Sequence, residues 1–346
     1  MSPLKFTLKR GVLLAGANWQ ATLVQAAADS LFKLLIAVPA IGGISFVGLV
    51  VGAEPSGLLA LEWREMVTTI VGALLSQPLV LLAFLAALAI ALVGGSLLLF
   101  LAKGGTVAVL TEGDRRIGDS LEQAPLHLST VRRASGFSVE AFMAASERFF
   151  PRFARLGACL MGVYLASAVL LLISVTAGRL TGRVLGDAAL MTIVFVAWIT
   201  VVNLYYLLTQ IIIVADDCTV SSALRRTARF LREDFRRIAT VFGVMMGVEL
   251  LAMGVSVLAI GALGLIAFVP FFGLAALPVQ LMAWLFRSVV FEFLGLTTVG
   301  AYLTLYRRDV TLVVAEAVRA SAAALAGPGA GQAPGPASSV SRTEGP

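Results

Sequence analysis

Long runs of apolar residues alternate with short polar segments along nearly the whole chain. Because a helix needs about 20 mostly apolar residues to cross the hydrocarbon core of a bilayer, such runs predict membrane-spanning helices. Six windows meet this requirement: residues 30–52, 68–102, 156–178, 188–214, 238–264 and 279–305. The predicted fold class is therefore all-α, a polytopic integral membrane protein with about six transmembrane helices.

Two of the predicted spans carry irregular features. The window 68–102 is longer than one perpendicular crossing requires, so it is expected to tilt, to project into the cytoplasm or to kink at Pro78. Beside the sixth span, Pro270 and Pro278 lie in a segment, 265–278, that favours a re-entrant or interfacial turn over the centre of a helix.

Amphipathic segments precede the first, third and fifth spans, at residues 5–20, 138–155 and 219–237. In the third segment one helical stripe is apolar: Leu224, Ala228, Leu231, Phe235 and Ile238. Arginines occupy the remaining surface: Arg225, Arg226, Arg229, Arg232 and Arg236. This pattern predicts a helix that lies in the membrane interface on the cytoplasmic side, with its arginines among anionic lipid headgroups.

The three amphipathic segments align without gaps. In each, a polar residue precedes an aromatic one at the same position: Asn18–Trp19, Arg152–Phe153 and Asp234–Phe235. The alignment favours three repeated units, each an interfacial helix followed by a helical hairpin, an arrangement common in membrane folds. The alternative is a chance similarity, because amphipathic basic helices resemble one another.

Composition supports the membrane assignment. Of the 346 residues, 59% are hydrophobic and 13% are charged, against about 25% charged in an ordinary soluble domain. A soluble protein of this composition would expose large apolar patches to water. We predict one membrane domain at 1–315, with a cytoplasmic loop and interfacial helix at 103–155. A cytoplasmic tail follows at 316–346, expected to be disordered from about 327, where Gly, Pro, Ala and Ser dominate.

The formal charge of +6 could suggest nucleic acid as a partner, but the basic residues flank the apolar runs. That placement favours the lipid bilayer and its anionic headgroups, with no nucleic acid. With the N-terminus inside, 22 of the 26 basic residues fall in cytoplasmic segments and three fall in outer loops: Arg64, Arg179 and Arg183. The bias predicts a multi-pass protein of the plasma membrane with both termini cytoplasmic. No cleavable signal peptide is expected, because the first apolar run begins late and is long.

Three charged residues fall inside the predicted spans, where charge is costly: Glu249, Arg287 and Glu292. One hypothesis is a proton, ion or substrate site, to which span four could contribute Asn203, Tyr206 and Gln210. Another is a structural ion pair, expected between Glu249 and Arg287 because Arg287 is the one basic residue deep in another span. A third is that Arg287 and Glu292 lie closer to the outer interface.

Signatures of enzymes are missing from the sequence. Cys159 and Cys218 fit no metal or redox spacing, and His127 has no companion ligands. Phosphate-binding glycine loops, zinc-protease motifs and serine-hydrolase elbows do not occur. We therefore predict no catalytic, cofactor or metal site and a protein that is not an enzyme. The Gly-xxx-Gly pair Gly243 and Gly247 is expected to pack helices together.

Short motifs resemble a family of bacterial six-span membrane domains. They are Ile211–Asp217, Ala223-Leu224-Arg225-Arg226-Thr227, Leu305–Asp309 and Lys103-Gly104-Gly105-Thr106. The family includes the membrane domain joined to some glycerophosphodiester phosphodiesterases. The resemblance covers roughly 1–315 and implies the fold. It implies no catalytic residue here, because the chain lacks a soluble block with the carboxylates and histidines that metal-assisted hydrolysis needs.

Two classes of function follow. The first is a non-enzymatic organising, anchoring or accessory protein of the bacterial envelope, with a membrane-protein partner or a homo-oligomer left open. The alternative is a transporter or permease for a small solute or lipid that uses the intramembrane charges.

Overall fold

The structure is a computed structural model that describes residues 3–51, 75–118, 128–180, 186–267 and 272–326, with isolated positions between 62 and 72. The chain divides into two units, Met1–Thr304 and Leu305–Pro346. Three features that the sequence singles out lie outside the described residues: His127, Pro270 at the centre of 265–278, and the tail from 327.

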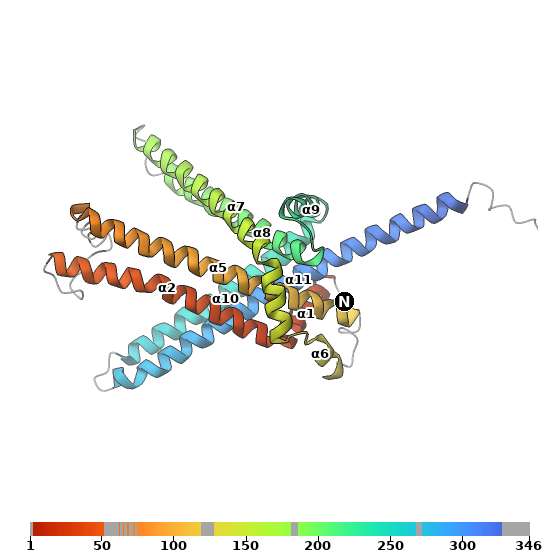
Figure 1. Cartoon of the computed structure of the whole chain (residues 1–346), viewed down its shortest axis with the longest axis horizontal. Coiled ribbons are helices and arrows are strands. Elements are labelled where there is room, and N and C mark those ends of the chain that lie inside the picture. Colours follow the sequence, from red (N-terminus) through yellow and green to blue (C-terminus); the bar gives the residue numbers. More distant parts are fainter. Residues whose placement is uncertain are drawn as a thin grey trace, which may run out of the picture. The chain divides into compact units, whose positions relative to one another are not determined.

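Every element in the described part of the chain is an α-helix (Figure 1). The helices are α1 (Pro3–Ala17), α2 (Trp19–Val51), α5 (Pro78–Ile117), α6 (Leu128–Ala134), α7 (Val139–Leu180), α8 (Gly186–Ala215), α9 (Val220–Glu233), α10 (Phe235–Ala267) and α11 (Phe272–Ala326). Six of these are long and apolar enough to cross a membrane, over Trp19–Gly43, Pro78–Ile117, Val139–Ser174, Leu190–Ala215, Phe235–Gly264 and Pro278–Arg308. The prediction of an all-α chain with six spanning helices is confirmed.

The helix boundaries differ from the predicted ones at two spans. Pro78 begins α5 instead of kinking it, since proline suits the first turn, where its missing N–H would be unpaired. The same helix continues to Ile117, beyond the predicted end at residue 102, because Thr106, Val107 and Leu110 are buried and extend its packed surface. The first spanning helix begins at Trp19, ahead of the predicted start at residue 30.

The three predicted amphipathic segments take two forms. The first is α1, separated from α2 at Asn18, and the third is α9, separated from α10 at Asp234. The second, 138–155, is continuous with the third span inside α7, which carries Pro151 within the helix.

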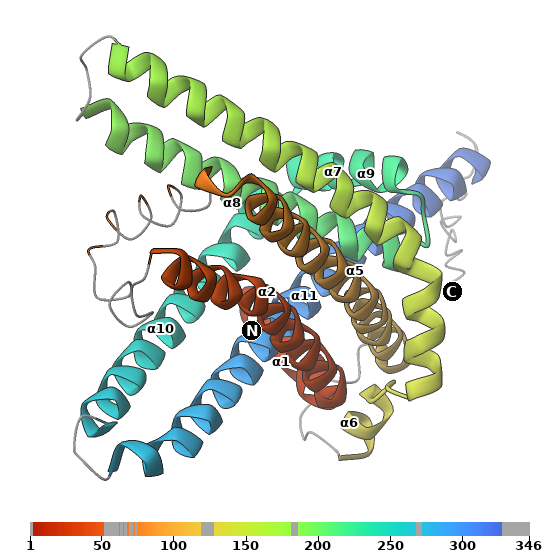
Figure 2. The same ribbon diagram turned by 60° about the vertical axis from the view of Figure 1, so that its left-hand side comes forward.

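Within Met1–Thr304 the spanning helices lie in pairs, with α2 beside α5 and α7 beside α8, and α5 also packs against α7. In both views α10 lies beside the first part of α11 (Figures 1 and 2). The pairs meet at one end, where the fully buried side chains include Leu110, Phe153 and Ile211–Ile213. Away from that end the helices expose apolar side chains such as Leu79, Ile193 and Leu258. A bilayer is the solvent that would cover such faces.

Glycines allow the closest helix contacts. A methyl group on Gly11 of α1 would lie 2.5 Å from the Thr297 carbonyl oxygen of α11, and one on Gly105 of α5 would lie 2.4 Å from Ser146 Oγ of α7. By contrast, nothing lies within 4 Å of the corresponding positions at Gly243 and Gly247 in the described chain. Among the described residues, neither glycine of this pair is at a close helix contact.

Buried polar contacts tie the short helices to the packed end. Arg10 of α1 forms a buried ion pair with Asp114 of α5 at 2.6 Å. Asn18 donates to the Leu14 and Ala134 carbonyl oxygens and accepts from the Gly136 N–H. These bonds fix α1 and α6 against α5, and with them the start of α2.

Candidate functional site

A charged cavity of about 570 Å³ lies between α2, α10 and α11. Its lining combines acidic, basic, aromatic and small residues: Asp29, Lys33, Met253, Trp284, Arg287, Ser288, Phe291, Glu292 and Gly295. Volumes of roughly 300–1,000 Å³ are usual for small-molecule sites. Two of the three predicted intramembrane charges, Arg287 and Glu292, therefore lie in one cavity.

Most of the charges around this cavity face an opposite charge. Asp29 and Lys33, one turn apart on α2, form an ion pair at 2.5 Å. Glu292 interacts electrostatically with Asp29, a like charge, and with the bases Lys103 of α5 and Lys33, and Lys103 also interacts with Asp29. Charges at membrane depth are stabilised by such mutual pairing.

The predicted ion pair between Glu249 and Arg287 is wrong. Among the described residues neither side chain has an ion-pair partner within 4.0 Å, and the Arg287 guanidinium lies over the Phe291 ring at 5.6 Å. Glu249 is half-buried on α10, interacts electrostatically with Tyr302, and does not line the cavity. Arg287 and Glu292, five residues apart on α11, both line the cavity, and no ion pair joins them.

The polar residues expected from the fourth span lie elsewhere. Tyr164 of α7 donates a hydrogen bond to Asn203 Oδ1 of α8. Gln210 is buried, and Tyr206 interacts with it. All three residues of α8 belong to the α7–α8 pair and do not line the charged cavity.

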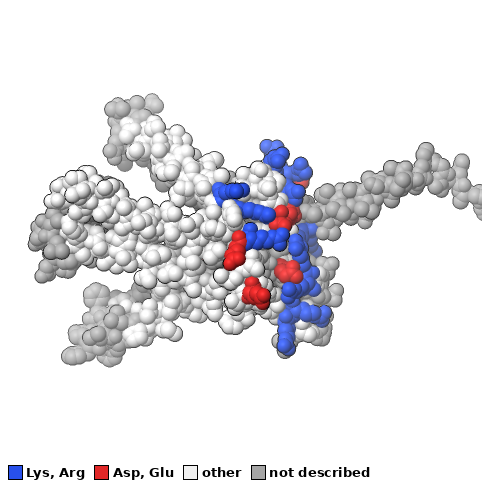
Figure 3. Space-filling model, in the orientation of Figure 1, with Lys and Arg blue, Asp and Glu red and all other residues white. Residues whose placement is uncertain are grey.

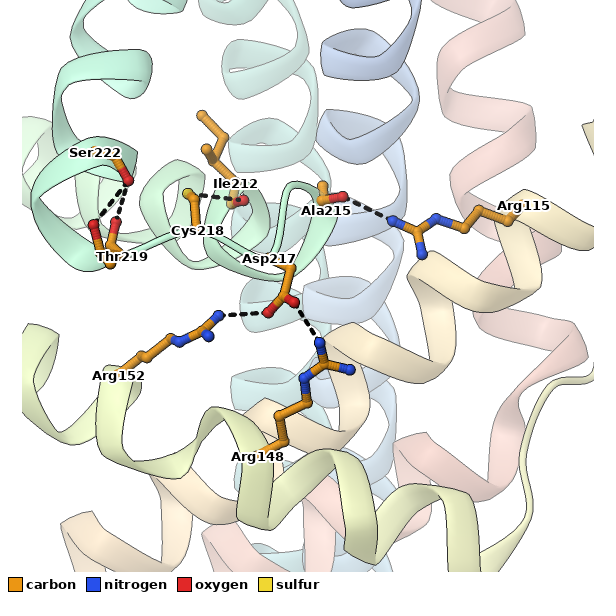
Figure 4. A network of polar contacts seen from close by, with 9 residues as sticks. All are labelled: Arg115, Arg148, Arg152, Ile212, Ala215, Asp217, Cys218, Thr219 and Ser222. Atoms are coloured by element: carbon orange, nitrogen blue, oxygen red, sulfur yellow. Dashed lines mark hydrogen bonds and ion pairs between the residues drawn. The ribbon is translucent and has the colours of Figure 1, made fainter.

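A second charged region surrounds the turn that follows α8 (Figure 4). The Cys218 N–H donates to the Ile213 carbonyl oxygen, and Asp217 between them has a φ of +47°. This is the helix-ending arrangement in which glycine is the usual left-handed residue, and an aspartate adopts it at a cost. Arg115 donates to the Ala215 carbonyl oxygen at 2.8 Å and so caps the end of α8.

The Asp217 carboxylate holds this turn against α7. It accepts hydrogen bonds from Arg148 and from Arg152, the latter at 2.6 Å, and both guanidinium groups lie over the Phe149 ring. The Arg152 hydrogen bond is the main reason that the pKa of Asp217 lies below its usual value, with the charges of both arginines adding to it. The carboxylate is therefore ionised and bound between two cations.

The following helix, α9, packs on α8 through a face that the sequence did not predict. Its buried residues are Ala223, Thr227 and Phe230. The Thr209 and Thr227 hydroxyls are hydrogen-bonded at 3.1 Å, and Tyr205 donates to the Leu224 carbonyl oxygen at 2.7 Å. Of the predicted apolar stripe, Ile238 is buried, while Leu224, Ala228 and Leu231 are half-buried and Phe235 is 61% exposed.

The five predicted headgroup arginines are all exposed, but they differ in their contacts. Arg226 pairs with Asp216, and Arg225 donates to the Ser221 carbonyl oxygen of its own helix. Among described residues, Arg229, Arg232 and Arg236 have no ion-pair partner within 4.0 Å. Basic side chains gather toward the packed end of the helices, and the described residues farther along the helices show no charge on this face (Figure 3).

No group of three or more His, Cys, Asp or Glu residues suited to a metal occurs among the described residues. Comparison of the chain with protein-family models, with curated proteins and with solved structures finds no match.

Sequence reasoning missed Asp29, Lys33 and Ser288 as lining residues of the charged cavity, and Lys103 as a charge that interacts with two of its acids. The first two lay at the edge of the predicted span and Lys103 just beyond another one. An acid and a base four residues apart, as Asp29 and Lys33 are, favour a helix that includes both. This spacing was the available signal that α2 begins before the predicted start at residue 30. Ser288 gave no signal, because a serine within a span usually bonds to its own helix.

Proposed function

We propose that this chain is a non-enzymatic protein of the bacterial plasma membrane that organises, anchors or assists other components of the envelope. In this proposal α9 lies in the cytoplasmic interface and binds anionic lipid headgroups. The observation that carries the proposal is the set of exposed arginines on α9 beside a half-buried apolar strip.

The residues of α9 divide into sectors when they are placed at about 100° per residue. The first sector is packed on α8: Ala223, Thr227 and Phe230. The next is apolar and only half-buried: Leu224, Ala228 and Leu231. The third is basic: Arg225, Arg229, Arg232 and, just beyond the helix, Arg236. An apolar sector next to a basic one suits a helix with acyl chains along one side and phosphates along the other.

The distribution of charge supports the proposed orientation. The segments assigned to the cytoplasm contain 22 of the 26 basic residues, which favours both termini inside. At about 1 kcal/mol per basic residue near an anionic surface, the arginines of α9 would together give substantial attraction.

Threefold repetition remains part of the proposal. Asn18 and Asp234, which occupy the same aligned position, are the residues at which α1 ends before α2 and α9 ends before α10. At that position α7 is continuous, with Pro151 directly before the aligned Arg152. Two of the three units thus share a break at an equivalent residue.

Kinship with the membrane domain of glycerophosphodiester phosphodiesterases is likewise proposed. Two of the motifs that carry the resemblance stabilise local structure, one a turn and the other a helix contact. Their roles support the proposal that these motifs mark a shared fold. Asp216 and Asp217 hold the turn between α8 and α9. Gly104 and Gly105 let α5 approach Ser146 and Phe149 of α7.

A four-arginine variant tests the lipid proposal. The full chain, extracted from bacterial membranes in polymer discs that retain a ring of native lipid, should carry more anionic lipid than the surrounding membrane. Replacing Arg225, Arg229, Arg232 and Arg236 with Gln should reduce that enrichment, and replacing the same four with Lys should preserve it because charge is kept. Equal lipid composition for the Gln variant and the parent chain would reject the proposal. Crosslinking of the same discs would identify partner proteins.

The second candidate is a transporter or permease for a small solute or lipid, favoured by the charged cavity between α2, α10 and α11. Ion flux into proteoliposomes that depends on Glu292, lost in Glu292→Gln, would favour it over the first candidate.

A further inference from the structure

Arg287 is a cation that forms no ion pair with any described residue, although Asp29 and Glu292 line the same cavity. It lies within Pro278–Arg308, and no described residue accepts a hydrogen bond or forms an ion pair with its guanidinium. A guanidinium offers five N–H donors. The contact of this guanidinium among the described residues is with the Phe291 ring, whose centroid lies 5.6 Å away, and that contact uses none of the five donors. Such a group at membrane depth requires an acceptor.

Ser288, the next residue, is also without a hydrogen-bond partner among the described residues. It is 92% buried, its Oγ is unpaired, and it lines the same cavity. Several other hydroxyls in the spans bond back to their own helix, as Ser167 does to the Val163 carbonyl oxygen at 2.7 Å and Thr304 does to Gly300 at 2.8 Å. Thr22, Ser146 and Thr297 are also buried and unpaired among the described residues, but they do not line this cavity. A buried hydroxyl that forgoes this bond is available to a ligand in the cavity.

The acids around the cavity interact with its other cations. Asp29 forms its ion pair with Lys33, and Glu292 interacts electrostatically with Lys33 and with Lys103, which lies outside the lining. Neither acid forms an ion pair with Arg287 among the described residues, so the guanidinium donors remain open to a bound anion. The planar fork of the guanidinium matches phosphate and carboxylate oxygens in a bidentate way.

The surroundings of the cavity favour an amphiphile. Met253, Trp284 and Phe291 contribute apolar lining, and the neighbouring turns of α11 expose Leu281, Met282 and Phe286. From these observations we propose that Arg287 and Ser288 bind the phosphate of a membrane phospholipid, whose glycerol and first methylenes lie along Trp284 and Phe291. The site is distinct from α9 and does not depend on the function proposed above.

The test uses the full chain in mild detergent, with phosphatidylglycerol as the probe and native mass spectrometry as the readout. Binding is measured at about 0.5 M salt, where exposed charges such as those of α9 are strongly screened and a partly enclosed site is less so. We expect one phosphatidylglycerol per chain, weakened at least about tenfold by Arg287→Gln, since a charge-assisted pair is lost. Ser288→Ala should weaken it several-fold, and Arg287→Lys should fall between Arg287→Gln and the parent chain.

Three comparisons separate the proposal from its rivals. Diacylglycerol with the same acyl chains should not compete, because it lacks the phosphate. The four-arginine α9 variant should bind as the parent chain does at this salt concentration, so failure of the α9 proposal would leave this one standing. Parent-like binding by Arg287→Gln would overturn the site. If Arg287→Gln fails to fold, parent-like binding by Ser288→Ala would overturn it. If inorganic phosphate displaces bound phosphatidylglycerol as effectively as added phospholipid does, the site binds free phosphate and the phospholipid proposal is overturned.

Discussion

At the scale of single residues, membrane depth alone does not predict which charges pair. Glu249 and Arg287 are both intramembrane charges, yet the acids near Arg287 are Asp29 and Glu292, while Glu249 lies by Tyr302. Which faces of two helices meet depends on their rotation about their axes. The sequence places a residue along a span but does not state that rotation.

This separation gives a stability prediction. Because Glu249 and Arg287 have no ion pair, the effects of Glu249→Gln and Arg287→Gln on unfolding should add within about 0.5 kcal/mol. The measurement is SDS unfolding in mixed micelles, followed by far-UV circular dichroism, for both single variants and the double variant. A double variant no less stable than the worse single variant would indicate that the two residues are paired after all.

A pH dependence is expected at Asp217. Its pKa is lowered by the Arg152 hydrogen bond, so its contribution to stability is complete above the ordinary Asp value and is lost as pH falls through the lower value of the folded state. Asp217→Asn tolerates the same left-handed backbone but forms no ion pair. The parent chain should therefore be more stable than Asp217→Asn at pH 7, by at most about 1 kcal/mol for a solvent-exposed cluster.

The comparison at Asp217 is made by thermal unfolding in detergent from pH 7 down to about pH 3, where an ordinary Asp is largely protonated. The difference between the two chains should shrink as the pH falls. A difference that stays constant over this range would show that the carboxylate charge does not hold the turn to α7.

At the scale of helices, periodicity predicted the existence of the elements better than their contacts. The arginine face and the apolar stripe of α9 were predicted, but the buried face of Ala223, Thr227 and Phe230 was not. Thr227 is polar, and its burial depends on the Thr209 hydroxyl of α8. A polar residue that finds its partner only in the folded protein cannot be recognised as core from one helix.

The contact between α1 and α11 gives a matched pair of variants. A methyl group at Gly11 would meet backbone atoms, 2.5 Å from the Thr297 carbonyl oxygen and 2.9 Å from the Ala301 nitrogen, whereas nothing lies within 4 Å of one at Gly16. Gly11→Ala should destabilise the chain by about 1–3 kcal/mol through overpacking. Gly16→Ala in the same helix should be neutral or stabilising by up to about 1 kcal/mol, because alanine favours the helix.

Unfolding of the two glycine variants in detergent by circular dichroism checks this prediction. Equal stabilities would mean that α1 is not held against α11 at Gly11. The role of Gly11 could not be predicted, because it depends on a backbone contact with a residue almost 300 positions away.

At the scale of the whole molecule, hydropathy predicted the number of spans, and the packing of Met1–Thr304 determined what the sequence left open. Six apolar windows correspond to six helices able to span a membrane. The charged cavity could not be predicted, because its residues come from α2, α10 and α11. Its unpaired members, Arg287 and Ser288, are recognised only once every nearby donor and acceptor is known.

The orientation of the six helices gives the last prediction. Basic residues number 22 in the segments assigned to the cytoplasm and three in the outer loops, and cytoplasmic loops of membrane proteins carry such an excess. Reporter fusions at residues 60, 183 and 272 should therefore read outside, and fusions at 125, 227 and 330 inside. An enzyme active only in the periplasm and a fluorescent protein active only in the cytoplasm give opposite readings at each site.

The fusion at 227 has a further consequence, because it lies in α9. If it reads outside, the arginines of α9 face the outer leaflet and the cytoplasmic headgroup proposal fails. If the fusion at 330 alone reads outside, the sixth helix does not cross the membrane, and Arg287 would no longer lie in a spanning helix.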